Sequence, residues 1–273
     1  MCTSFAAYLG KPLYGMNFDF QEREIQFRLE SNRDVSALLI SFREKDEYLY
    51  IAGVNNNGVF FNFQIEEPIT DRTVLESRNN IDIGTIFEKT MNSAKDLDNI
   101  QGIIQNNRIT VEGPLTLHSL LADSKGNAFV LETDGHKNYI CEGTKDFIVM
   151  TNFPNRDLAA KPFHEICGAG LDRYKLAYNY IQANKDAFDL PHAFEILKMT
   201  AQNKEHCKTI CSMVFTPDTN EVYFSLNSDH NRIWKISIEK MILKTYKGFK
   251  DTKILNMNCG RGILSSELHR LSF

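Results

Sequence analysis

The chain has 273 residues, enough to bury a large core, and we expect a single domain over residues 1–273. Hydrophobic residues make up 42% of the sequence and charged residues 24%, a balance that argues against intrinsic disorder, a collagen-like repeat and a coiled coil. The formal charge of -4 provides no basic field to attract phosphate backbones, so we expect no nucleic acid partner.

The order of predicted elements begins with strands. Alternating apolar positions predict strands over residues 2–9, 12–20, 36–42, 47–54 and 58–65, and we interpret these as an antiparallel meander. Turns are predicted at Gly10-Lys11 and at Asn55-Asn56-Asn57-Gly58. Apolar residues then recur at helical spacing between residues 82 and 106, which predicts two helices, with Asp82 and Asp96 near their starts.

Strands and helices alternate once more in the second half of the chain. Strands are expected over residues 116–122, 127–133, 137–142 and 147–151, helices over 171–183 and 191–202, and strands over 209–216, 221–227 and 232–239. Strands, helices, strands, helices and strands in that order favour an α+β plan in which two packed antiparallel sheets lie between outer helical layers. No internal repeat or linker divides the chain.

Targeting and membrane segments are not evident in the sequence. Apolar runs such as Phe147-Ile148-Val149-Met150 are far shorter than the roughly 18 residues that suggest a membrane span. The first residues carry no basic segment, and polar residues begin at Asn17, which argues against a signal peptide. We therefore expect a cytoplasmic protein that does not span a membrane.

Six scattered cysteines are too few for a disulfide framework, and most are expected to be buried thiols. His206-Cys207 and Cys211 lack the further ligands of a tetrahedral metal site, and no glycine-rich phosphate-binding motif occurs. We therefore expect neither a metal nor an organic cofactor.

Cys2 is the exception among the cysteines, because it directly follows Met1. A small residue in this position permits removal of the initiator methionine, which would make Cys2 the N-terminus. An N-terminal cysteine combines a nucleophilic thiol with an α-amine whose usual pKa of about 7.7–8.0 suits a base. On this residue alone, the favoured interpretation is that a cysteine at position 2 is an accident of a short first strand.

The first hairpin brings a carboxylate toward Cys2. If Gly10-Lys11 is a two-residue loop, Leu9 faces Pro12 and Cys2 faces Asp19. Asp19 could then accept hydrogen bonds from the amine and raise its basicity. The alternative is an exposed carboxylate at the end of a strand.

Several short motifs extend the pattern along the chain. They are Met1-Cys2-Thr3-Ser4-Phe5, Gly15-Met16-Asn17-Phe18-Asp19, Asn57-Gly58-Val59-Phe60-Phe61-Asn62-Phe63, Met150-Thr151-Asn152-Phe153-Pro154 and Leu171-Asp172-Arg173-Tyr174, followed by a late strand pair from Thr209 to Phe224. In this order they resemble the choloylglycine hydrolase and penicillin V acylase family of N-terminal-nucleophile (Ntn) hydrolases, and the related acyl-CoA:isopenicillin acyltransferase group. The resemblance is weak but touches most of the chain.

The resemblance implies an αββα four-layer sandwich and a hydrolase of linear carbon–nitrogen amide bonds. In it, Cys2 would attack the amide carbonyl, and Asn152, which otherwise reads as a turn residue, would bind the oxyanion together with a backbone N–H near Asn62 and Phe63. Asp19 would orient the amine. Arg173, otherwise an ordinary surface arginine, would form ion pairs beside the nucleophile.

Two features depart from the family pattern. The family usually has arginine where this chain has Met16, so a cation that lowers the thiol pKa is missing. Either Arg173 serves both purposes, or the chemistry is slower, or the chain is a noncatalytic relative. The short span from Asn152 to Arg173 also lacks the long loop of bile-salt-hydrolase-like tetramers, so we do not expect tetramers of that kind and leave other homo-oligomers open.

The function predicted from the sequence is therefore hydrolysis of a small-molecule N-acyl amide through a Cys2 acyl-enzyme. The alternative is a noncatalytic or acyl-transferring relative that binds an acylated ligand. Bile-salt conjugates, penicillin V, N-acyl homoserine lactones and fatty-acid amides all fit, because no residue in the sequence separates them.

Overall fold

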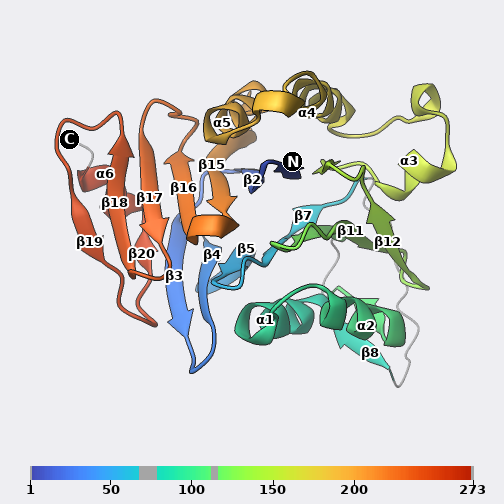
Figure 1. Ribbon diagram of the computed structural model, residues 1–273, viewed down its shortest axis with the longest axis horizontal. Helices are drawn as coiled ribbons and strands as arrows, with labels where there is room; N and C mark the ends of the chain where they lie inside the picture. The colour runs from blue at the N-terminus through green and yellow to red at the C-terminus, as the bar shows by residue number, and fades with distance from the viewer. Residues whose placement is uncertain (1, 68–78, 112–115, 272–273) are drawn as a thin grey trace.

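A computed structural model describes residues 2–67, 79–111 and 116–271 of the chain, and Met1 lies outside these ranges. Two nine-stranded sheets, antiparallel in every pairing, pack face to face between helices, which confirms the predicted α+β class and the αββα sandwich (Figure 1). Their apolar faces form one core between the sheets, and two further cores lie under the helical layers. None of the helices in the described part is long and apolar enough to cross a bilayer.

The first sheet contains the N-terminal hairpin. In order across the sheet its strands are β13 (Phe147–Met150), β1 (Thr3–Leu9), β2 (Lys11–Phe20), β15 (Cys207–Thr216), β16 (Glu221–Leu226), β17 (Ile233–Ser237), β18 (Ile242–Lys247) and β19 (Ile254–Asn256), with β14 (Asn203–Lys204) paired to β15. Helices α4 (Leu171–Ala183) and α5 (Leu190–Met199) cover its outer face. The short helices α3 (Arg156–Ala160), η1 (Phe163–Glu165), η2 (Lys185–Ala187) and η3 (Pro217–Thr219) lie in its connections.

The second sheet is built mostly from the first half of the chain. Its order is β12 (Asn138–Glu142), β11 (Ala128–Thr133), β10 (Leu117–Ala122), β6 (Phe60–Asn62), β5 (Glu47–Asn55), β4 (Ser36–Glu44), β3 (Ile25–Ser31) and β20 (Ile263–Leu264), with β7 (Gln64–Ile65) paired to β10. Helices α1 (Ile83–Ser93) and α2 (Asp98–Asn106) cover its outer face, next to the parallel pair β8 (Asn80–Asp82) and β9 (Arg108–Thr110). Helix α6 (Ser265–Leu271) follows β20.

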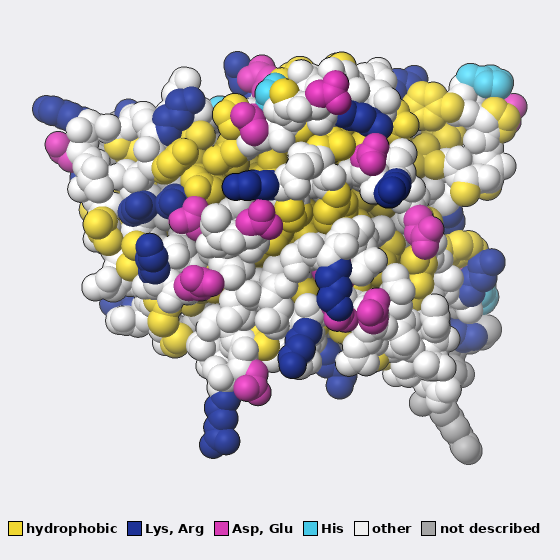
Figure 2. Space-filling model, viewed as in Figure 1, with side chains coloured by type: hydrophobic (Ala, Val, Ile, Leu, Met, Phe, Trp, Pro, Cys, Tyr) yellow, Lys and Arg dark blue, Asp and Glu magenta, His cyan; other side chains and the backbone are white. Residues whose placement is uncertain are grey.

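The edge of the sandwich exposes apolar side chains. Figure 2 shows them as a band between the α4–α5 layer and the α1–α2 layer. This band follows from the architecture, because two sheets packed face to face leave the rim of their shared core nearest the solvent.

Local signals explain where several elements begin. Asp82 accepts a hydrogen bond from the backbone N–H of Gly84 and so caps α1, as its position near the predicted start suggested. Asp189 caps α5 in the same way through the N–H of His192, and Pro191 lies in the first turn.

The predicted meander is wrong in its connectivity. The hairpin β1–β2 belongs to the first sheet, whereas β3 to β6 form a meander in the second sheet, so the chain changes sheets after Phe20. The strand β3 was not predicted, although Ile25, Phe27 and Leu29 alternate with polar residues there. The strands β18 and β19 and the helix α6 were not predicted either.

The predicted register of the first hairpin is wrong by one residue. Gly10 adopts a φ of 86°, a left-handed conformation that favours glycine, and Leu9 therefore pairs with Lys11. Thr3 faces Asn17, and Cys2 is consequently not opposite Asp19. A slip of one residue moves a side chain to the other face of the sheet, so Asp19 lies on the face that α4 and α5 cover.

Candidate active site

Cys2 lies just before β1, is 5% exposed and belongs to the core between the sheets. The backbone N–H of Asp19 donates to the Cys2 Sγ at 3.4 Å. Burial raises the pKa of the Cys2 thiol to about 11, although the positive charge of Arg173 opposes this shift. The thiol is therefore protonated at neutral pH, and it needs a base before it can act as a nucleophile.

Asn152 follows β13 and is fully buried. Its Oδ1 accepts hydrogen bonds from the Cys2 nitrogen at 2.8 Å and from Arg173 Nη2 at 2.7 Å. Its Nδ2 donates to the carbonyl oxygen of Ile65 at 2.7 Å. Asn152 therefore joins the nucleophile, the arginine of α4 and the strand β7, which are far apart in the sequence.

Arg173 is in the first turn of α4 and is buried, not a surface arginine. Its Nη1 donates to the Cys2 carbonyl oxygen and, at 2.9 Å, to Thr3 Oγ1. The preceding Gly170 has a φ of 82°, and a Cβ there would lie 2.5 Å from Arg173 Nη2. A glycine at this position therefore gives the guanidinium its space.

Asp19 lies on the helical side of the first sheet, where Arg173 Nη1 is 3.7 Å from its Oδ2 and Thr209 Oγ1 donates to its Oδ1 at 2.5 Å. Burial raises the pKa of Asp19 to about 6, against the lowering effects of Thr209 and Arg173. The carboxylate and Arg173 together form a buried ion pair behind the nucleophile. The sequence motifs predicted Asp19 and Arg173 as site residues, but not Thr209.

The raised pKa of Asp19 predicts a pH dependence of stability. Because the folded pKa of about 6 exceeds the unfolded value of about 3.9, ionisation favours unfolding, and roughly 2 kcal/mol is lost between pH 4 and pH 7. Asp19→Asn lacks this loss. The difference in free energy of unfolding, variant minus unaltered protein, should thus become more positive across that interval in urea titrations, and a constant difference would contradict the assignment.

The side chain of Met16, in β2, points away from Asp19 and Arg173 into the core between the sheets, where it meets Asn62 of β6. Met16 is 1% exposed, and its Sδ lies 3.8 Å from Asn62 Nδ2. Asn62 also donates to Ser4 Oγ at 2.6 Å and accepts from the N–H of Leu120 at 2.9 Å. An apolar side chain therefore occupies position 16, where the resemblance implies an arginine.

Phe63, predicted together with Asn62 at the oxyanion, has its backbone N–H bonded to the carbonyl oxygen of Ile51 at 2.8 Å. Its ring lines a pocket instead. The next residue, Gln64, donates to Ser4 Oγ, as Asn62 does, and no sequence motif predicted this role.

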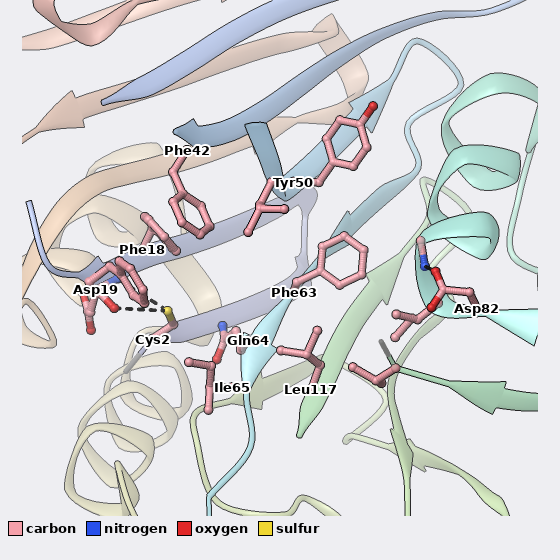
Figure 3. A pocket seen from close by; sticks show the side chains of 15 residues that line it. Cys2, Phe18, Asp19, Phe42, Tyr50, Phe63, Gln64, Ile65, Asp82 and Leu117 are labelled. Carbon is pink, nitrogen blue, oxygen red and sulfur yellow. Dashed lines mark hydrogen bonds between the residues drawn. The ribbon is translucent and has the colours of Figure 1, made fainter. Parts of the chain in front are cut away.

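A cavity of about 300 Å³ opens beside Cys2 (Figure 3). Figure 3 shows Cys2 and Asp19 at one end and Asp82 at the other, with aromatic and aliphatic side chains between them. The apolar lining comes from both sheets and α1, and includes Phe18, Phe20, Phe42, Leu49, Tyr50, Phe63, Ile65, Ile83, Val111 and Leu117. The rings of Phe18, Phe20 and Phe42 lie 5.2 to 5.7 Å apart. The pocket therefore suits an apolar group next to the thiol.

One group of side chains has the composition of a metal site. Potential ligand atoms of Glu66, His118 and Glu132 lie within 4.8 Å of one another, and all three residues are buried. However, Arg156 forms ion pairs with Glu66 at 2.8 Å and with Glu132 at 2.9 Å. A bound cation would lie beside a guanidinium that already neutralises these carboxylates, so the cluster does not fit a metal well.

Comparisons with known proteins identify the fold. The chain matches no protein-family model and no curated protein sequence. Its structure is similar to a conjugated bile acid hydrolase from Clostridium perfringens, with a TM-score of 0.69 and 17% identity over 94% of this chain and 97% of that one. It is also similar to a penicillin V acylase from Agrobacterium tumefaciens, with a TM-score of 0.68 and 14% identity over 94% of this chain and 100% of that one.

A third solved structure, the Caenorhabditis elegans ortholog of an N-acylethanolamine-hydrolyzing acid amidase, has a TM-score of 0.53 and 13% identity, and the match covers 79% of this chain and 93% of that one. All three are Ntn hydrolases. At these identities the likeness concerns the fold, and it agrees with the resemblance found in the sequence motifs. The chain has the αββα fold of the Ntn hydrolases.

Proposed function

We propose that the chain hydrolyses the linear amide bond of an N-acylated small molecule through an acyl-enzyme on Cys2. The observation that carries this proposal is the position of Cys2 at one end of an apolar pocket, with Asn152, Arg173 and Asp19 grouped behind it. A cysteine that only filled the core would not need two buried polar side chains bonded to its own backbone atoms.

The first chemical step is proton transfer from the thiol. Once Met1 is removed, the Cys2 amine takes this proton, directly or through one water, because the two groups belong to the same residue. The hydrogen bond to Asn152 Oδ1 fixes the orientation of that nitrogen. The thiolate then attacks the amide carbon, a C–S bond forms, and the carbonyl oxygen becomes an oxyanion.

Asn152 is the proposed donor to this oxyanion. Its Nδ2, now bonded to the Ile65 oxygen on the pocket wall, would turn to the carbonyl oxygen. The backbone N–H of Phe63 is engaged by the Ile51 carbonyl oxygen, so we do not propose it as a second donor. When the tetrahedral intermediate collapses, the C–N bond breaks and the leaving amine takes the proton from the Cys2 ammonium. Water then attacks the thioester, which releases the acid and restores the thiol.

Arg173 takes over the charge that Met16 does not supply. It lies on the helical side of the hairpin, donates to the Cys2 carbonyl oxygen and pairs with Asp19. From this position it lowers the pKa of the thiol, against the dominant effect of burial. An active enzyme is therefore compatible with an apolar residue at position 16.

The pocket supports a proposal for how the two halves of the substrate bind. Its apolar lining holds the acyl chain, and the amine product leaves toward the solvent. The lining residues include Asp82 but neither lysine nor arginine, and the Asp19 carboxylate is already paired with Arg173, so the acyl group is expected to carry no negative charge.

The test of this function is a panel of N-acyl amides assayed for released amine, on protein whose N-terminus has been checked by intact-mass measurement. We expect loss of Met1 and turnover of amides with uncharged, apolar acyl groups. Dicarboxylic acyl amides of the same length serve as the matched control and should react poorly. Retained Met1 with no turnover on any amide would favour the alternative, a noncatalytic relative that binds an acylated ligand.

A further inference from the structure

The buried cluster around Glu132 adjoins the segment that carries Asn152, and it has no part in the chemistry described above. Glu132 is in β11, His118 is in the neighbouring β10, and Glu66 directly follows β7. The side chains of Glu132 and His118 are fully buried, and that of Glu66 is 1% exposed. Arg156, at the start of α3, bridges the two glutamates.

Both carboxylate oxygens of Glu132 accept hydrogen bonds from the chain that follows Asn152. Oε1 accepts from the backbone N–H of Asn155 at 2.5 Å and is 3.4 Å from His118 Nδ1. Oε2 accepts from the backbone N–H of Arg156 at 3.2 Å and from its Nη1 at 2.9 Å. Glu132 therefore holds the residues three and four positions after Asn152.

The other side of the same segment is held by the chain around Glu66. The N–H of Glu67 donates to the Asn152 carbonyl oxygen at 2.7 Å, and Asn152 Nδ2 donates to the Ile65 oxygen. Arg156 Nη2 donates to Glu66 Oε1 at 2.8 Å. The turn from Asn152 to Arg156 is thus fixed between β11 and β7, and its conformation determines where the Asn152 amide points.

The charge on Glu132 is maintained despite its burial. Burial raises the pKa of this carboxyl, but the hydrogen bond and charge of His118 and the charge of Arg156 outweigh it and hold the pKa below its ordinary value. An ionised carboxylate offers only acceptors, which is what two backbone N–H groups and a guanidinium require. A neutral amide of the same shape offers one acceptor oxygen and one donor group.

We propose that Glu132 is a positioning residue that acts through the turn from Asn152 to Arg156 to hold the Asn152 amide at the Cys2 site. The expected effect of Glu132 on catalytic turnover rests on the proposed function, whereas its effect on the conformation of residues 152–156 does not. A displacement of about 1 Å in a group that binds the transition state can cost about 100-fold in rate, so a residue without substrate contact can matter in this way.

Glu132→Gln is the decisive variant, because it keeps the shape of the side chain and replaces one acceptor by a donor. We expect kcat to fall by roughly 10- to 100-fold, with KM changed by less than about twofold. In an Asn152→Ala background the same substitution should cause no further fall, because its effect passes through Asn152. Glu221→Gln, which breaks the ion pair of Glu221 with Lys235 in the first sheet, is the matched control and should leave kcat unchanged.

Hydrogen exchange measures the turn without reference to activity. The N–H groups of Asn155 and Arg156 should exchange faster in Glu132→Gln, whereas the N–H of Leu120, bonded to Asn62, should not change. If Glu132→Gln does not fold, Arg156→Lys keeps the charge but cannot reach both glutamates in two directions, and it should show the same changes to a smaller extent.

Three results would overturn the proposal. They are unchanged exchange at Asn155 and Arg156, an equal fall in kcat with and without Asn152, and a stoichiometric divalent metal in the purified protein that Glu132→Gln removes. If the unaltered protein cleaves no amide, the proposed function fails, and the exchange measurement alone decides on the turn.

Discussion

Cys2→Ala is expected to lower kcat/KM for amide hydrolysis by about 10⁴-fold or more, since no neighbouring side chain can replace the covalent nucleophile. The free energy of unfolding should fall by only about 1 kcal/mol, because the substitution removes one buried sulfur and leaves the backbone contacts to Asn152 and Arg173 intact. Amine release and urea titration of the same preparation measure the two quantities together.

The matched control for this variant is Cys211→Ala. Cys211 is 2% exposed and lies in the same core between the sheets. The variant Cys211→Ala therefore removes a comparable sulfur and leaves the nucleophile in place. We expect a similar change in unfolding free energy and nearly full turnover. If Cys2→Ala kept turnover comparable to that of Cys211→Ala, the acyl-enzyme on Cys2 would be refuted.

The sequence predicted the fold class because periodicity survives in most elements. Alternation identified β10, β11 and β15, and helical spacing identified α1 and α4. The sequence could not predict which sheet each strand joins. Alternation shows that β3 has a buried face, but it does not specify that β3 pairs with β4. The register of the first hairpin depended on Gly10 alone, and a single left-handed residue there moved Asp19 to the other face.

The site residues named from the sequence motifs do meet in space, although Cys2, Asn152 and Arg173 are separated by 150 and 21 positions. The orientations of these side chains, and hence their contacts, could not be predicted. Asn152 presents its oxygen to the Cys2 nitrogen, a contact expected from Asp19, while Asp19 reaches the site through Arg173. Thr209 and Glu132 were missed because a polar residue inside a strand shows no sign of its partner in the one-dimensional pattern.

The second large effect is expected from Arg173→Ala. This variant removes the donors to the Cys2 oxygen, Thr3 Oγ1 and Asn152 Oδ1, and leaves Asp19 buried without its guanidinium. Breaking a buried ion pair from one side costs about 3–5 kcal/mol, and we expect kcat/KM to fall about 10³-fold as both Cys2 and Asn152 lose their support. Lys175→Ala, exposed on the same helix, is the control and should change neither quantity.

Arg173→Ala should also raise the pKa of the Cys2 thiol, because the arginine charge is one of the effects that lower it. The measurable result is slower alkylation of Cys2 by iodoacetamide at neutral pH. The rate has to be followed on the peptide that contains residue 2, since Cys167 and Cys259 are exposed and react as well. Met16→Arg tests whether the cation can be supplied from the other face of the hairpin.

Met16 pairs with Ser4 in the register of the hairpin, so its side chain lies on the same face as the Cys2 thiol, inside the core between the sheets. An arginine there would approach the thiol from the core side, whereas Arg173 approaches the Cys2 backbone from the helical side. In the Arg173→Ala background, Met16→Arg should therefore partly restore the alkylation rate, at a cost in stability from burying a charge. If the alkylation profile is the same in the single and double variants and in the unaltered protein, neither position controls the nucleophile, and the methionine marks lost or altered chemistry.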